Sequence, residues 1–368
     1  MLDHIADAMK EPDVVRLDRN VHVLRFEMMK LHSALEAVRR LLADGVVKPG
    51  DTLMDSSSGT YGHSLALACH KYGMKCRIVC STKLDDTMRR QFEMLGARVD
   101  QVEIPAGPLV DKMDQRARLD RVAEILDTED DVHWMQQYHD DVHYLGYRAC
   151  ADLLLKEFGG APLTLVGGVG TGASTGGLTS YLREMGADVT LVGVQPFESV
   201  TFGSEPVEDP VASISGIGSP IVMRNVRYEL YDRVHWIGYE SAVAATTALL
   251  RRHAVYAGMS SGCNYLAATW EAAHAPERPC VFIAADTGHR YAENVYGRPQ
   301  GDESIESLTP RRIDALDQLA FPWSVMDWKR RDFQPLGAVR PRTDRHKKYV
   351  ASVPGAAPAP SRSKEVLL

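Results

Sequence analysis

Segments typical of β-strands alternate with segments typical of α-helices along most of this chain, and this alternation constrains the fold more than any other feature. Residues 21–27 are rich in strand formers, and residues 31–45 follow with apolar side chains at helical spacing and a closing glycine. The same pairing recurs as far as about residue 286. It predicts an α/β fold with mostly parallel sheets and crossover helices. Several expected strands are continuous apolar runs, which indicates that helices cover both sheet faces.

The composition is that of an ordinary globular protein. The 368 residues are enough for two domains, and 45% of them are hydrophobic and 25% charged. The formal net charge of −7 gives no basic footprint, so we expect no nucleic-acid partner. No apolar run approaches the roughly 18 residues that a membrane helix needs. The first residues carry acidic side chains and no apolar segment, so we expect neither a secretory signal nor a membrane anchor.

Six cysteines are scattered along the chain without a zinc-like CxxC pair. A chain of this size does not need disulfides, so we interpret them as reduced and mostly buried thiols of a cytoplasmic protein. No metal site is predicted. The cysteines are Cys69, Cys76, Cys80, Cys150, Cys263 and Cys280.

The alternating pattern fades after about Leu308. Residues 321–337 are aromatic and basic, which is typical of an ordered lid or a docking segment. Residues 352–368 are small and proline-rich, so we expect disorder there. This tail is interpreted as a solvated extension or as a peptide that binds a partner.

A glycine-rich segment, GGVGTGASTGG at residues 167–177, lies between an expected strand and an expected helix. Free N–H groups and the helix dipole at such a helix start favour a phosphate, although a tight strand-to-helix turn would look the same. The segment lacks the GK[ST] ending of a P-loop. It fits only the looser dinucleotide motif that ends in alanine, and Gln195 stands where a ribose-binding acid is expected.

A second helix start, DSSSGTYGHSLALA at residues 55–68, is rich in hydroxyl groups. Hydroxyls and free N–H groups there suit a small carboxylate, while a plain serine N-cap is the alternative. Lys30 stands at a strand-to-helix junction beside two methionines. A lysine in apolar surroundings can form a Schiff base. A phosphate site, a carboxylate site and a reactive amine together favour pyridoxal phosphate acting on an amino acid.

The order of these motifs resembles the cysteine synthase/cystathionine β-synthase family of fold-type II pyridoxal-phosphate enzymes, from about Val14 to Tyr291. KPGDTLMDSSSGTYG resembles the family's KPGDT followed by SGNTG, MLGARV resembles its ALGA segment, and MQQY resembles its QQF. GGVGTGASTGG resembles GxGTGGTxxG, and SISGIGSP resembles the QGIG loop. GMSSGCN resembles GISSG, and AADTGHRY resembles PDSGxRY. Seven motifs in the family's order make the resemblance specific.

The resemblance implies the roles of individual residues. Lys30 is expected to be the Schiff-base lysine and general base. Ser260 is expected to bond the pyridine nitrogen, which favours chemistry at the β-carbon. Contact with the cofactor is expected from Lys30, Thr60, Gly170, Thr171, Gly172, Ala173, Ser174, Thr175 and Ser260. Contact with the amino-acid substrate is expected from Ser57, Ser58, Gly59, Thr60, Gln137 and Gly216.

Several positions depart from the family pattern. Thr60 replaces an asparagine, and the bulkier Tyr61 replaces a threonine. Ala173 replaces a glycine of the phosphate loop, and HDDVHYLGY replaces the NPAN run. Met28, Met29 and His32 surround the lysine in place of Ser, Val and Arg. These changes are expected around the cofactor and the substrate mouth, and they predict a specialised branch with an altered substrate pair.

The resemblance also implies an architecture and a reaction. Two three-layer αβα domains are expected: residues 1–48 and 141–310 form a large cofactor-binding domain, and residues 49–140 form a small mobile domain. Residues 311–368 form a partly disordered extension, and the chain is expected to be a homodimer. The expected reaction is β-replacement on an O-activated L-serine, either O-acetylserine or O-phosphoserine, through an aminoacrylate, with a sulfur or other nucleophile. The alternatives are β-elimination, a non-catalytic cofactor-binding relative and a nucleotide-binding oxidoreductase.

Overall fold

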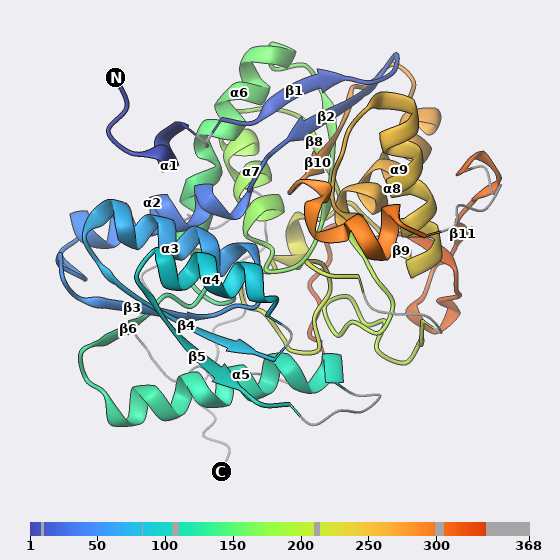
Figure 1. Cartoon of the computed structure of the whole chain (residues 1–368). Helices are drawn as coiled ribbons and strands as arrows, with labels where there is room; N and C mark the ends of the chain where they lie inside the picture. Colours follow the sequence, from blue (N-terminus) through green and yellow to red (C-terminus); the bar gives the residue numbers. More distant parts are fainter. Residues whose placement is uncertain (9–10, 83, 105–109, 210–213, 299–304, 336–368) are drawn as a thin grey trace, which may run out of the picture.

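The computed structural model describes residues 1–8, 11–82, 84–104, 110–209, 214–298 and 305–335, and their strands form two separate sheets (Figure 1). The larger sheet has the order β1-β2-β10-β7-β8-β9-β12-β11. Its strands are β1 (Asp13–Arg16), β2 (Val21–Arg25), β7 (Leu163–Gly168), β8 (Val189–Gln195), β9 (Arg233–Ile237), β10 (Cys280–Ala284), β11 (Arg311–Arg312) and β12 (Trp323–Asp327). Strands β2, β10, β7, β8 and β9 are parallel neighbours, while β1 and β12 pair antiparallel with β2 and β9. The α/β class with mostly parallel sheets is confirmed.

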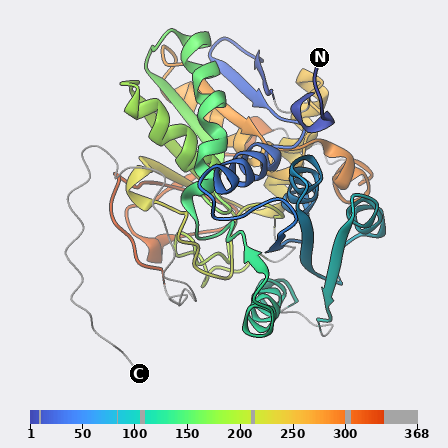
Figure 2. The same cartoon turned by 90° about the vertical axis from the view of Figure 1, so that its left-hand side faces the viewer.

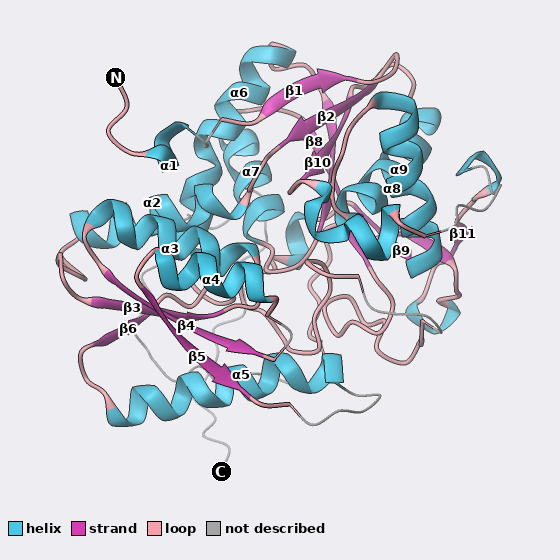
Figure 3. Cartoon of the chain, viewed as in Figure 1, coloured by secondary structure: helices cyan, strands magenta, loops and turns pink. Residues whose placement is uncertain are grey.

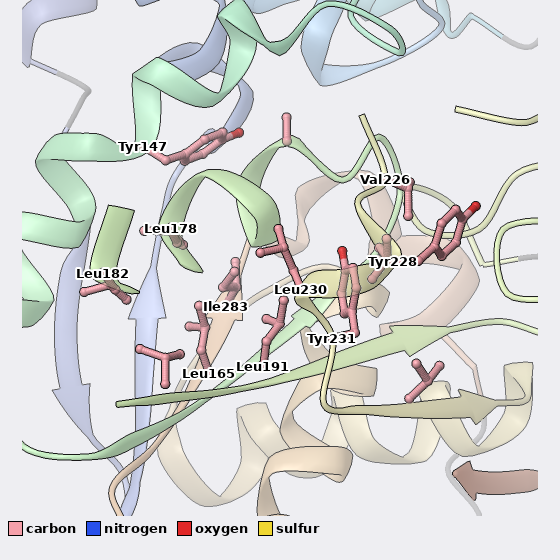
Figure 4. Close-up of a cluster of buried hydrophobic side chains, with 14 of the residues drawn as sticks. Tyr147, Leu165, Leu178, Leu182, Leu191, Val226, Tyr228, Leu230, Tyr231 and Ile283 are labelled. Atoms are coloured by element: carbon pink, nitrogen blue, oxygen red, sulfur yellow. The ribbon is translucent and has the colours of Figure 1, made fainter. Parts of the chain in front are cut away.

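Helices cover both faces of the larger sheet. Helices α6 (Arg148–Phe158) and α7 (Ala173–Glu184) lie on one face, and α8 (Tyr239–His253) and α9 (Met259–His274) lie on the other (Figure 3). Because side chains alternate along a strand, Leu165 and Ile283 pack with the first pair of helices, and Val166 and Phe282 pack with the second. This double burial explains the continuous apolar strands of the sequence. Figure 4 shows Leu178, Leu182, Leu165, Leu191, Leu230 and Tyr231 in the first of these two cores.

The smaller sheet is entirely parallel, with the order β5-β4-β3-β6. Its strands are β3 (Thr52–Ser56), β4 (Lys75–Ser81), β5 (Ala97–Val102) and β6 (Val132–Trp134). Helix α5 (Val110–Thr128) covers one face, while α3 (Thr60–Tyr72) and α4 (Asp86–Met94) cover the other (Figure 1). Figure 2 shows α5 on the far side of the molecule from α6 and α7. These strands come from within residues 49–140, and the division into domains and the mobility of the small one stay predictions.

Two further elements join the sheets. Helix α2 (Lys30–Ala43) follows β2 and packs against α3 and against the 3₁₀ helix η1 (Asp141–Tyr147). The packing of α2 on η1 is close, because a Cβ on Gly146 would collide with the backbone carbonyl of His32. A short helix α1 (Ile5–Ala8) precedes β1. Helix η1 also packs against α7, so α2 and η1 connect the helices that cover the two sheets.

The interpretation of the segment after residue 320 as a lid is wrong for residues 323–328. They form β12 and its continuation, and Trp323 and Trp328 are only 3% and 0% exposed. Trp323 Nε1 donates a hydrogen bond to His235 Nδ1 at 3.1 Å. Burial of two indole rings explains why this aromatic segment joins the sheet. The proline-rich tail at 352–368 lies outside the described residues.

All six cysteines are buried and free, as the sequence predicts for unpaired thiols. Among the described residues, no helix is both long and apolar enough to cross a membrane.

Candidate active site

The glycine-rich segment turns from β7 into α7, as the sequence predicts. Gly172 has a left-handed backbone (φ +83°), and α7 begins at the next residue. The Thr171 hydroxyl oxygen accepts a hydrogen bond from the Ala173 N–H at 3.3 Å. A helix of this length leaves its first N–H groups without partners inside the helix, which suits an anion.

The glycines of this segment are required by the protein's own backbone. A Cβ on Gly170 would lie 2.5 Å from the carbonyl oxygen of Gly216. A Cβ on Gly172 would lie 2.5 Å from the carbonyl oxygen of Asn225 and 2.8 Å from Cα of Val226. The segments around residues 216 and 225 therefore press directly on the loop. Close packing of the backbone therefore explains the glycines. The expected anion site depends instead on the free N–H groups at the start of α7.

Lys30 is the first residue of α2 and lies at the carboxyl end of β2. The chain between β2 and α2 follows the end of β10, because Phe26 N–H donates to Ala284 O and Met29 N–H donates to Ala285 O, both at 2.9 Å. β10 in turn lies between β2 and β7 in the sheet. Parallel strands end at the same sheet edge, so the loops after β2 and β7 meet there.

The Lys30 ammonium reaches the glycine-rich segment. Its Nζ donates a hydrogen bond to Thr171 Oγ1 at 3.3 Å. Burial lowers the pKa of Lys30 to about 8, because the protein interior disfavours the charged form. A lysine with a lowered pKa has a larger neutral fraction near pH 7, and the neutral amine is the nucleophilic form. The structure brings the predicted reactive lysine and the predicted phosphate site together.

Ser260 lies in the first turn of α9, where it is 7% exposed. The N-cap residue Gly258 donates its N–H to Asp286 O at 3.4 Å, and Ser261 Oγ accepts from Ala285 N–H at 3.2 Å. The end of β10 therefore holds the starts of both α2 and α9. The helices that carry Lys30 and Ser260 are therefore anchored to the same short segment, residues 284–286, and the contact of Ser260 with the cofactor stays a prediction.

The remaining predicted cofactor residues differ in their location and in the contacts that their side chains already make inside the protein. Ser174 is buried in the first turn of α7. The Thr175 hydroxyl already contacts Tyr231 OH at 2.7 Å, so it supports the packing of α7. Thr60 is the first residue of α3, and it belongs to the second helix start.

On the substrate side, the Ser57 hydroxyl serves as a cap of α3. Its Oγ accepts hydrogen bonds from Gly59 N–H at 3.2 Å and Gly62 N–H at 2.9 Å. Gly59 is the N-cap residue of α3, so Ser57 satisfies N–H groups of the helix start from two positions before it, and a contact of this hydroxyl with substrate stays a prediction. Ser58 Oγ lies 3.4 Å from Ser81 Oγ at the end of β4. Gly216 has φ +89°, and a Cβ there would meet nothing within 4 Å.

Asp55, at the end of β3, positions Gln137, and the sequence did not single it out for this role. Its carboxylate accepts from the N–H of Gln137 at 2.9 Å, of Ser56 at 2.7 Å and of the Trp134 indole at 3.1 Å. The Gln137 side chain donates to Ser56 O at 2.7 Å. Burial raises the pKa of Asp55 to about 6, against the effect of these donors. No spacing pattern announces this role, because the donors come from distant segments.

Asn225 links the two halves of the site, and no sequence motif marked it. Its Nδ2 donates to Gln137 O at 3.1 Å and to Asp140 O at 2.9 Å. Its own carbonyl oxygen accepts from the Tyr144 hydroxyl and lies against Gly172. One residue thus connects the substrate-side segment to the glycine-rich turn.

Asp286 and Arg290 belong to the motif AADTGHRY, and the sequence assigned neither of them a role of its own. Burial raises the pKa of Asp286 to about 6, and its Oδ1 is a buried atom with no hydrogen-bond partner in the described part of the chain. That oxygen lies against Gly258 at the start of α9. The Arg290 Nη1 atom lies 3.1 Å from where a Cβ on Gly59 would be. This segment therefore reaches from the Ser260 helix to the α3 helix start.

The position of Tyr61 corrects the expectation that this departure from the family pattern lies around the cofactor and the substrate mouth. Its side chain is 3% exposed and belongs to the core formed by α2, α3 and β4. Its ring packs edge-on against His143, with centroids 5.5 Å apart. The second residue of α3 faces inward toward α2, so the larger ring fills the core.

These residues fit pyridoxal phosphate. An amine with a lowered pKa stands 3.3 Å from a hydroxyl at an anion-binding helix start. The Ser260 hydroxyl lies at the adjacent strand end together with Asp286 Oδ1, a buried oxygen that has no hydrogen-bond partner among the described residues, and these two groups suit a polar ring. Lys30 would bind the aldehyde, residues 170–175 the phosphate, and Ser260 the ring nitrogen.

Comparisons with known proteins agree with this geometry. A curated relative, the N-(2-amino-2-carboxyethyl)-L-glutamate synthase of Ralstonia nicotianae, is 28% identical over 294 residues, which cover 77% of this chain and 82% of the relative. An O-acetylserine sulfhydrylase isoform 3 structure from Entamoeba histolytica has a TM-score of 0.72 at 19% identity and covers 83% and 94% of the two chains. An O-acetylserine-dependent cystathionine β-synthase structure from Helicobacter pylori has a TM-score of 0.72 at 21% identity and covers 80% and 99%.

The two solved structures share the fold of this chain, which confirms the expected fold type. The pyridoxal-phosphate dependent enzyme family model matches residues 24–286, more than half of the chain. The chain belongs to the pyridoxal-phosphate dependent enzyme family.

Proposed function

We propose that this protein joins a nucleophile to the β-carbon of an O-activated L-serine, using pyridoxal phosphate. The observation that carries the proposal is the hydrogen bond between Lys30 Nζ and Thr171 Oγ1, which sets a reactive amine against the phosphate-binding helix start. The bound cofactor supplies the electrophilic aldehyde and the electron sink for loss of the α-proton and the β-substituent.

The chain's own residues have the following proposed tasks. Lys30 Nζ holds the cofactor at rest and takes the α-proton from the bound donor as general base. The start of α3, with Ser57, Ser58, Gly59 and Thr60, binds the donor carboxylate together with Gln137. Asp55 and Asn225 fix the backbone of Gln137 by hydrogen bonds at 2.9 and 3.1 Å. Ser260 at the ring nitrogen leaves that nitrogen unprotonated, which favours β-carbon chemistry.

An amine nucleophile is the proposed second substrate class. The name of the Ralstonia relative describes a product in which a 2-amino-2-carboxyethyl unit is attached to the nitrogen of glutamate. The departures from the cysteine synthase pattern at Thr60 and in residues 139–147 support a nucleophile other than sulfide.

We also propose that the protein is a homodimer in the cytoplasm. Its six free, buried cysteines support a reducing compartment.

The test supplies O-phosphoserine or O-acetylserine to the loaded protein, with L-glutamate, sulfide or thiosulfate. Mass spectrometry should find an amine adduct of the three-carbon unit with one donor. If only an S-adduct forms, the nucleophile is a sulfur compound and the proposed amine class is wrong. Pyruvate formation that is unchanged by every nucleophile would show β-elimination and contradict the proposal.

A further inference from the structure

His143 is a buried residue of η1, the 3₁₀ helix that packs against α2, and none of the roles above uses it. Its side chain is 0% exposed. Its Nδ1 lies 3.0 Å from Ser33 Oγ, and its Nε2 lies 2.9 Å from Met135 O and 3.5 Å from Tyr61 OH. A single ring therefore contacts three separate segments.

Each of these segments carries a candidate site residue. Ser33 stands three residues after Lys30 on α2, which places the two on neighbouring turns of the same helix face. Met135 precedes Gln137 by two residues, and Tyr61 directly follows Thr60. The ring of His143 thus connects the lysine helix to both substrate-side segments.

The partners fix which nitrogen carries the hydrogen. The Met135 carbonyl can only accept, so His143 Nε2 is the donor and Nδ1 accepts from the Ser33 hydroxyl. Burial lowers the pKa of His143 to about 4, and the charge of Lys30 also lowers it. The ring is therefore neutral at pH 7, with both nitrogens in use. A ring held in one tautomer fixes the spacing of the groups that it joins.

We propose that His143 is a positioning residue that sets the Lys30 amine relative to the donor-binding segments. The proposal rests on the assignment of Lys30 as the cofactor-binding lysine. The Ser33 bond holds the first turns of α2, and the Met135 bond holds the segment that leads to Gln137. A displacement of about 1 Å at a reacting group can cost about 100-fold in rate.

Two conservative variants separate the two bonds. In His143→Asn the amide occupies the place of Nδ1 and keeps the Ser33 contact, whereas in His143→Gln the amide N–H replaces Nε2 and keeps the Met135 contact. We expect His143→Gln to lower kcat at least roughly tenfold with donor KM nearly unchanged. His143→Asn should raise donor KM several-fold and keep most of kcat. Ser33→Ala should behave like His143→Gln.

Ser64→Ala is the matched control for Ser33→Ala. Ser64 is likewise a buried helical serine, but it lies on the neighbouring helix α3 and donates its hydroxyl to Thr60 O at 2.8 Å within that helix. A second readout needs no donor: the rate at which cofactor-free protein regains the visible absorbance of bound pyridoxal phosphate. This rate should fall in Ser33→Ala and His143→Gln and match the wild type in His143→Asn and Ser64→Ala. It tests the inference even where the proposed reaction fails.

Equal behaviour of His143→Asn and His143→Gln in both readouts would overturn the proposal, because a purely structural role responds to both losses alike. Cofactor reloading of Ser33→Ala at the rate of Ser64→Ala would also overturn it. Ser33→Ala removes a single hydroxyl, so it keeps the test decisive if the His143 variants do not fold.

Discussion

The Lys30 amine and the Thr171 hydroxyl are hydrogen-bonded at 3.3 Å across 141 positions of sequence. Lys30 follows β2 and Thr171 follows β7, and β10 lies between these two strands. The parallel sheet thus brings a reactive amine and an anion-binding helix start to one edge.

The pH dependence of cofactor loading should report the lowered pKa of Lys30. Only the neutral amine attacks the aldehyde, so the loading rate of cofactor-free protein should rise with pH and level off above about 8. Visible absorbance measures this rate, and Nα-acetyl-lysine in solution controls for titration of the cofactor itself. A midpoint near 10.5, the ordinary value for lysine, would mean that burial does not activate Lys30.

Gly172→Ala should weaken cofactor binding, and Gly186→Ala should not. Both glycines have left-handed backbones, with φ +83° and +86°, so backbone strain alone should cost each variant about 1–2 kcal/mol of unfolding free energy. Only the Cβ on residue 172 meets neighbouring backbone, whereas at Gly186 it meets nothing within 4 Å. We expect at least a roughly tenfold higher cofactor Kd for Gly172→Ala, which corresponds to about 1.4 kcal/mol. Equal Kd values in titrations of the two variants would contradict the close packing of this turn.

Tyr61 variants should change stability more than donor recognition. Tyr61→Thr leaves a cavity in the core beside His143 and should cost about 3 kcal/mol in urea unfolding. Tyr61→Phe keeps the ring and should stay within about 1 kcal/mol. Donor KM should change little in Tyr61→Phe. A large change in donor KM with unaltered stability in both variants would contradict the core position of Tyr61 and indicate that it lies at the substrate mouth.

Asp55→Asn should disturb donor binding through Gln137. The Gln137 N–H donates to Asp55 Oδ2 at 2.9 Å, and an amide nitrogen cannot accept at that position. We expect donor KM to rise several-fold in steady-state assays, with cofactor Kd unchanged because Asp55 lies on the smaller sheet. An unchanged donor KM would show that Gln137 does not depend on this carboxylate.

The same variant should alter the pH dependence of stability. The pKa of Asp55 is raised to about 6 from the ordinary 3.8, so the native state binds the proton more tightly than the unfolded state. Between about pH 4 and 6 the wild type should therefore lose stability relative to Asp55→Asn as pH rises. Urea unfolding at pH 4.5 and 7 measures the difference, and an opposite slope would contradict the assigned burial.

The sequence predicted those parts of the site that are encoded locally. The helix starts at residues 57–60 and 171–175 and the lysine at a strand end each carry recognisable turn chemistry, so their positions follow from short motifs. His143 and Asn225 could not be found in this way, because their partners lie 110 and 88 positions away. Their importance arises from tertiary packing, which a motif does not record.

Two errors have similar physical causes. Tyr61 faces the core because the first turn of α3 is oriented by its packing on α2, and the sequence does not show that orientation. Residues 323–327 form a strand that pairs antiparallel with β9, although the segment is short and flanked by charges. The strand also pairs with β11 on its other side, and the burial of Trp323 and Trp328 stabilises a position in the sheet that the flanking charges do not indicate.

The most direct test of the central claim is to reduce the loaded protein with borohydride and map the modified peptide by mass spectrometry. The account predicts the phosphopyridoxyl group on Lys30 and no retained visible absorbance in dialysed Lys30→Ala. Modification of a different lysine, or a Lys30→Ala protein that keeps its absorbance after dialysis, would contradict it.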